Sequence, residues 1–151
     1  MKEVYFALIG LVTTVGASIF SSKLTVRQMC QSRWWERKER AYTEIIEALY
    51  DLLQYSSLCA DEYINPKINE HPKKKEYAKR YLDAYWRIQK MTDIGPFVIS
   101  QETSKALDEL RDKPKLNWDQ NPPWEIYEED ALHYREALKV IKQCAKRDLK
   151  V

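Results

Sequence analysis

Residues 41–53, AYTEIIEALYDLL, carry the clearest fold signal in the chain. Their apolar residues recur every three or four positions, which is the spacing of one face of an amphipathic helix. Because this spacing continues on both sides without Gly or Pro, we expect one long helix from Leu24 to Tyr63 that ends before Asn65-Pro66. Its apolar positions are Trp35, Tyr42, Ile45, Ile46, Leu49, Leu52, Leu53, Cys59 and Tyr63.

Three more helices are expected after a polar loop. Residues 73–92 form the first, with an inner face of Tyr77, Tyr81, Tyr85 and Ile88. Gly95-Pro96 breaks it, the apolar run 97–99 could be extended, and Ser100 looks like the N-cap of a short helix over residues 101–111. Residues 123–149 form the last helix, whose acidic first turns and basic end suit the helix dipole.

The composition agrees with an all-helical chain. Of 151 residues, 32% are charged and only three are glycine, so the Gly-rich turns that join many short strands are missing. The predicted fold class is all-α: an N-terminal transmembrane helix, residues 1–23, followed by a cytoplasmic bundle, residues 24–151, of three long helices and one short helix.

The transmembrane helix is predicted from Val4 to Ser22, VYFALIGLVTTVGASIFSS, which contains no charged residue. At about 1.5 Å per residue the run spans roughly 28 Å, close to the hydrocarbon thickness of a bilayer. A cleaved signal peptide is the main alternative, with a passable site at residues 15–17, but the short Met-Lys-Glu start is nearly neutral.

The flanking cations predict the orientation of this anchor. Lys2 alone precedes it, whereas Lys23, Arg27, Arg33, Arg37, Lys38 and Arg40 follow it. Positive flanks stay in the cytoplasm, so the C-terminal domain should face the cytoplasm from the bacterial inner membrane. Three isolated cysteines without a C-x-x-C pair agree with a reducing compartment, where we expect them to be buried and reduced.

One face of the anchor is small. Gly10, Thr14, Ala17 and Ser21 recur at helical spacing and would let two membrane helices approach closely, although such residues are also common in lone spans. The bilayer and a homo-oligomer are therefore expected partners.

No catalytic motif is present, so we expect neither an enzyme nor a cofactor. The chain has two histidines, and the single Asp130-x-x-His133 pair falls short of the two Glu-x-x-His motifs of a di-iron bundle, so no metal site is expected. A net charge of only +2 argues against a nucleic-acid partner.

Two basic clusters remain. Residues 33–40, RWWERKER, mix both signs and are read as a solvated helix face with Trp34 and Trp35 in the core, or as a contact with anionic lipid. The second cluster is Lys73, Lys74 and Lys75, followed by Lys79, Arg80 and Arg87, and the first five of these are the candidate ligand contacts. It is either a solvated helix start or a contact for a small anionic ligand, and the nearby tyrosines would either stack on a base or form a core stripe.

Two strings resemble a known group of proteins. Trp35-x-x-Lys38-x-x-Ala41-Tyr42-x-x-Ile45-Ile46-x-x-Leu49 and Ile94-Gly95-Pro96-Phe97-x-Ile99-Ser100 are similar to patterns in small, poorly characterised bacterial membrane-anchored helical proteins. The resemblance covers about the first two thirds of the chain. It implies a bacterial inner-membrane setting and, because some such proteins are membrane effectors of anti-phage defence, a similar role; it transfers no catalytic residue.

The leading hypothesis is a non-enzymatic membrane effector or accessory protein. Its cytoplasmic bundle would sense a partner protein or a small anionic signal, and its anchor would oligomerise and perturb the membrane. The alternative is a membrane-tethered scaffold that recruits a cytoplasmic protein and leaves the bilayer intact.

Overall fold

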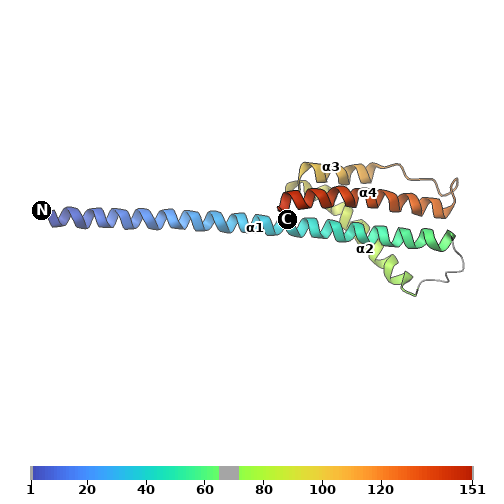
Figure 1. Ribbon diagram of the computed structural model, residues 1–151, viewed down its shortest axis with the longest axis horizontal. Coiled ribbons are helices and arrows are strands. Elements are labelled where there is room, and N and C mark those ends of the chain that lie inside the picture. Colours follow the sequence, from blue (N-terminus) through green and yellow to red (C-terminus); the bar gives the residue numbers. More distant parts are fainter. Residues whose placement is uncertain (1, 65–71, 151) are drawn as a thin grey trace. The chain divides into compact units, whose positions relative to one another are not determined.

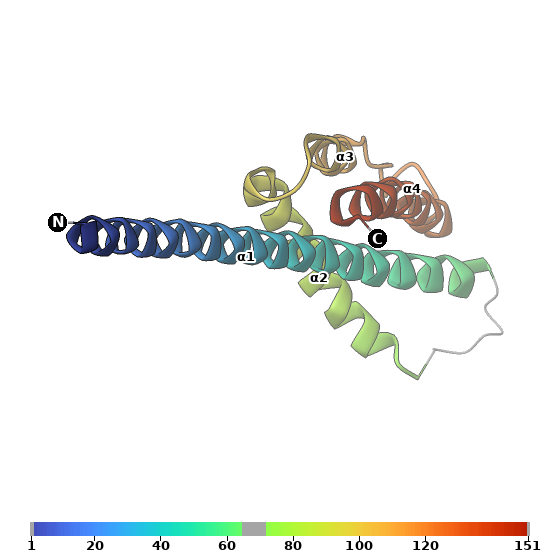
Figure 2. The ribbon, with the colours of Figure 1, turned by 60° about the vertical axis from the view of Figure 1, so that its left-hand side comes forward.

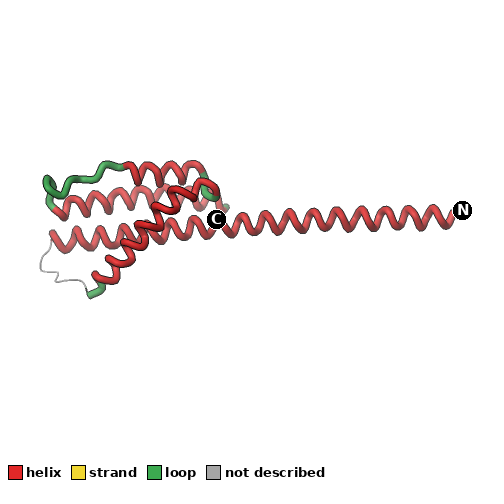
Figure 3. The backbone as a smooth tube through the Cα atoms, turned by 180° about the vertical axis from the view of Figure 1, so that it is seen from behind, coloured by secondary structure: helices red, strands yellow, loops and turns green. Residues whose placement is uncertain are grey.

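The computed structural model describes residues 2–64 and 72–150, and the side chains of residues 28–64 and 72–150. The elements in chain order are α1 (Lys2–Ile64), α2 (Lys74–Ile94), the 3₁₀ helix η1 (Gly95–Phe97), α3 (Gln101–Asp112) and α4 (Pro123–Leu149). Within the described ranges the backbone contains no strand (Figure 3). The predicted all-α class with four helices is confirmed, and the helix bounds differ from the predicted ones by two residues or fewer, except at the start of α1.

The chain divides into two compact units, Met1–Arg37 and Lys38–Val151. In the first unit the side chains of residues 28–37 are exposed, among them Trp34 at 50% and Trp35 at 43%. The prediction that this Trp pair packs in the core is therefore wrong. The first buried residue described in α1 is Ala41. Trp35 keeps the helical spacing of the apolar residues, but it precedes the part of α1 that is buried.

The side chains of the predicted anchor, Val4 to Ser22, lie outside the described part of the structure, and so does its small face of Gly10, Thr14, Ala17 and Ser21. No helix in the part that was described has the length and apolar content needed to cross a bilayer.

The second unit is a helical bundle around one core (Figure 1). From α1 the core takes Tyr42, Ile45, Leu49 and Leu52, which recur every three or four residues. From the other helices it takes Ala84, Ile88, Met91, Leu107, Tyr134, Ala137, Ile141 and Cys144. Because each helix presents one apolar stripe, the four stripes can be buried only by packing against one another.

The link between α2 and α3 differs from the prediction. Residues 97–99 are not extended, because Gly95–Phe97 forms a 3₁₀ turn with Pro96 in its first positions. The Val98 and Ile99 amides both donate to the Gly95 carbonyl, at 2.7 and 2.9 Å, and Ile99 is buried in the core. This tight turn lets the chain reverse within a few residues (Figure 2).

Of the three cysteines, Cys59 and Cys144 are buried as expected and Cys30 is exposed. The expectation of burial is wrong for Cys30, which lies before the buried face of α1 begins.

Candidate functional site

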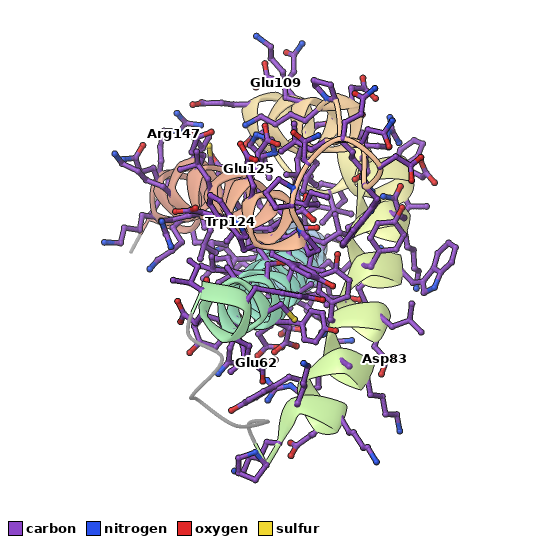
Figure 4. The ribbon with its side chains drawn as sticks, turned by 90° about the vertical axis from the view of Figure 1, so that its right-hand side faces the viewer. Glu62, Asp83, Glu109, Trp124, Glu125 and Arg147 are labelled. Atoms are coloured by element: carbon purple, nitrogen blue, oxygen red, sulfur yellow. The ribbon has the colours of Figure 1, made fainter. Side chains whose placement is uncertain are left out.

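The predicted basic cluster lies at the start of α2, and its residues have different surroundings. Lys73 immediately precedes the helix, and Lys74 forms an ion pair with Glu62 near the end of α1. Figure 4 labels Glu62 at this end of the bundle. Lys75 and Lys79 are exposed on α2.

Arg80, the last of the five candidate contacts, faces α1. Its Nη2 lies 2.5 Å from Asp51 Oδ1, and Arg87 Nη2 lies 3.1 Å from Asp51 Oδ2. The Asp51 side chain is 8% exposed, whereas the two guanidinium side chains are partly exposed. A buried carboxylate between two arginines is compensated in charge and in hydrogen bonds, and it fixes the register of α2 against α1.

A groove of about 480 Å³ opens beside this ion-pair group. Arg80 of α2 and Lys142 of α4 both line it, with Glu47, Tyr50 and Asp51 from α1. A guanidinium has five N–H donors, so the bond to Asp51 leaves donors for a second acceptor. The lining carries no net charge, because Glu47 and Asp51 balance Arg80 and Lys142, and the two cations, from different helices, are the groups that would hold a small anion. Lys142 was not among the predicted ligand residues, and its position could not be inferred without knowing which faces of α2 and α4 share a groove.

The tyrosines of α2 belong mainly to the bundle. Tyr81 and Tyr85 pack against the core, and the Tyr81 ring lies 4.8 Å from that of Tyr55. Burial raises the pKa of both Tyr81 and Tyr55. Neutral, packed rings of this kind favour the core-stripe interpretation over base stacking for Tyr81 and Tyr85. Tyr77 is half-buried, with the Arg80 guanidinium 6.0 Å from its ring centroid.

The acidic surroundings of His133 do not form a ligand set in the described residues. His133 Nε2 lies 3.9 Å from Glu129 Oε1, and no group of three or more His, Cys, Asp or Glu side chains there is close enough to hold a metal ion. Asp130 is partly buried, and this burial raises its pKa.

A feature that the sequence analysis missed is a second groove, of about 360 Å³, along α4. Its basic lining residues are Arg135, Lys139, Lys142 and Lys146. The signal that could have revealed it is the helical spacing of these four cations; only the basic end of the helix was interpreted, as a match to the helix dipole.

In comparisons with known proteins, the chain matches no family model, no curated protein and no solved structure.

Proposed function

We propose that the protein is a non-enzymatic, single-pass effector of the bacterial inner membrane, acting in anti-phage defence. Residues 1–23 anchor it, oligomerise and perturb the membrane, and the cytoplasmic bundle senses a partner protein or a small anionic signal. The uncharged run from Val4 to Ser22 and the six cations after it support the anchor and its orientation.

The observation that carries the sensing part is the groove between Arg80 and Lys142. An anion bound there would use the Arg80 donors that Asp51 leaves free and would join α2 to α4. It can shift the bundle between two arrangements only by the difference between its affinities for them.

The test is membrane integrity in cells induced to express the full chain. We expect depolarisation and dye entry with wild type, and a clear loss of both with Arg80→Gln/Lys142→Gln at equal membrane abundance. Lys90→Gln, at an exposed position of α2, is the matched control. An intact membrane potential in wild-type cells, with or without phage infection, would overturn the effector proposal.

The scaffold alternative has an observation of its own. Four large apolar side chains of α2 and η1 are exposed: Leu82 (56%), Trp86 (64%), Ile94 (49%) and Phe97 (79%). Leu82 and Trp86 are four residues apart and share one face of α2, and exposed aromatic residues are typical of protein–protein contacts. A scaffold would keep the membrane intact and would lose a co-purifying cytoplasmic protein in the variant Trp86→Gln/Phe97→Gln.

A further inference from the structure

One face of α4 carries a row of exposed residues along nearly the whole helix. They follow one another at intervals of three or four positions: Glu125, Glu128, Leu132, Arg135, Lys139, Lys142 and Lys146. We name this row the α4 charge stripe. It is acidic before Leu132 and basic after it. Figure 4 labels Glu125 in the first turn of α4.

The charges of the stripe have no ion-pair partner among the described residues. Other charged residues of α4 do have one: Glu136 pairs with Lys113 at 2.9 Å, and Arg147 with Glu102 at 2.8 Å. Two grooves follow the stripe, one of about 590 Å³ at Glu125 and Glu128, and one of about 360 Å³ at its basic end.

The middle cations of the stripe oppose the stability of their own helix. Arg135, Lys139 and Lys142 are like charges three and four residues apart, a spacing at which they repel one another. The helix dipole favours cations only in the last turn, and Lys139 lies ten residues before Leu149, the last residue of α4. A molecule with the opposite charge pattern would remove this repulsion.

We propose that the α4 charge stripe binds the same stripe of a second copy of the chain, with the two α4 helices antiparallel about a two-fold axis. The register follows from the residue spacing. Glu125 and Glu128 lie as far before the midpoint between His133 and Tyr134 as Lys142 and Lys139 lie after it. Glu125 of each copy therefore faces Lys142 of the other, and Glu128 faces Lys139. Each pairing occurs twice, as an isologous contact requires.

In this register Leu132 lies near the axis, opposite Arg135 of the second copy, and its side chain, 47% exposed in the single chain, can pack against the aliphatic part of that arginine. A second copy is favoured over an anionic lipid surface or another polyanion, because those would match the basic half and be repelled by Glu125 and Glu128.

The contact shares Lys142 with the proposed anion groove, but it involves neither the anchor nor membrane damage, and its test scores only a crosslink between two chains. Two differently tagged full-length chains, one with Glu125→Cys and one with Lys142→Cys, are mixed in detergent and treated with a short bismaleimide. Both carry Cys30→Ser, because Cys30 is the exposed native thiol. We expect a product that joins the two tags and fades at high salt.

The matched control places Glu125→Cys in both chains. In the antiparallel register these positions lie 17 residues apart along the helix, roughly 26 Å, so no product should form. A product of equal yield from this pair would overturn the antiparallel contact. No product from either pair would overturn self-association through α4 altogether.

A charge exchange tests the register. Adding Glu128→Lys to the Glu125→Cys chain places a lysine against Lys139 of the other copy, and the yield of the crosslinked product should fall about fivefold. Adding Lys139→Glu to the Lys142→Cys chain should then restore it. Asp83→Lys, on α2 (Figure 4), should change nothing. Failure of the exchange to restore the product would overturn the proposed pairing, and binding of wild type to phosphatidylglycerol vesicles without any crosslink would assign the basic half to lipid.

Discussion

Tyr42 joins three helices through a single hydroxyl. The side chain is almost fully buried, and its Oη lies 3.1 Å from both Ser100 Oγ and Thr103 Oγ1 and also donates to Asp148. The group thus connects α1, the start of α3 and the end of α4. It also explains why Ser100 occupies the N-cap position of α3 without a side-chain cap bond: its hydroxyl contacts Tyr42 and Thr103 instead.

Removing this hydroxyl should weaken the bundle. We expect Tyr42→Phe to lower the free energy of unfolding by about 1–2 kcal/mol, because it leaves buried acceptors with one donor fewer. Tyr50→Phe is the control, since Tyr50 is exposed, and it should change stability by less than about 0.5 kcal/mol. Denaturant unfolding followed by circular dichroism measures both, and equal effects would show that the network contributes nothing.

Asp148 makes the same network sensitive to acid. Burial works to raise its pKa, but the hydrogen bonds from Tyr42 and Ser100 and the charges of Lys38 and Arg147 outweigh burial, so the pKa lies below its ordinary value of 3.8. A carboxylate with a lowered folded-state pKa stabilises the fold above the unfolded-state value, and this contribution is lost as pH falls through the folded-state value.

The expected result is a pH-dependent difference between wild type and Asp148→Asn. Wild type should be the more stable of the two above about pH 5, and the difference should shrink as the pH falls below 3.8. Unfolding free energies measured at a series of pH values give the difference directly. A difference that stays constant from neutral to strongly acidic solution would rule out this role for Asp148.

At the scale of the elements, local sequence signals predicted the helices well. The range 123–149 matches α4, and residues 101–111 and 73–92 fall within two residues of α3 and α2. These bounds depend on nearby Pro, Gly and polar residues, which the sequence displays directly. Which face of each helix is buried depends on its neighbours, so the same reasoning placed Trp34 and Trp35 in the core although both are exposed.

The candidate site was predictable only in part for the same reason. The five cations at the start of α2 were recognised as a cluster, yet Lys74 and Arg80 form ion pairs with Glu62 and Asp51 of α1. Neither pairing follows from spacing, since the partners lie 12 and 29 residues away in sequence. The sequence likewise shows Lys142 and the charged residues of the α4 charge stripe, but it does not show which of them share a groove with residues of other helices.

The contact between α1 and α2 should depend on Asp51. In the variant Asp51→Asn the neutral amide no longer compensates Arg80 and Arg87, and we expect a loss of about 1–3 kcal/mol. This loss of free energy of unfolding is smaller than that expected for a fully buried ion pair, because both arginines are partly exposed. Hydrogen exchange should rise most in α2. Asp83→Asn, exposed on the same helix, is the control, and uniform exchange across α2, α3 and α4 would argue against a specific α1–α2 role.

At the scale of the whole molecule, the two units raise different questions. In the bundle, the core, the ion pairs of Asp51 and the grooves are seen directly in the described residues 38–64 and 72–150. The role of the N-terminal unit rests on sequence: an uncharged run long enough for a bilayer, a positive flank and a small face. The effector proposal needs both, because sensing in the bundle changes the membrane only through association of the anchors.

The small face of the anchor therefore provides the last prediction. The double variant Gly10→Leu/Ala17→Leu should separate neighbouring membrane helices, because bulky side chains prevent the close approach that Gly and Ala permit. Either substitution alone should weaken assembly, since packing of a few small residues contributes modestly. The control, Val12→Leu/Ile19→Leu, adds no comparable bulk and changes positions that helical spacing places on the opposite face.

The readout is depolarisation of induced cells together with crosslinking between anchors in isolated membranes. We expect both to be lost in the double variant and kept in the control, at equal membrane abundance. Because the α4 contact is scored by its own pair of cysteines, it should survive in the double variant. Depolarisation that persists when the anchors no longer crosslink would separate membrane damage from anchor assembly. An intact membrane in every strain, wild type included, would leave the scaffold as the better account.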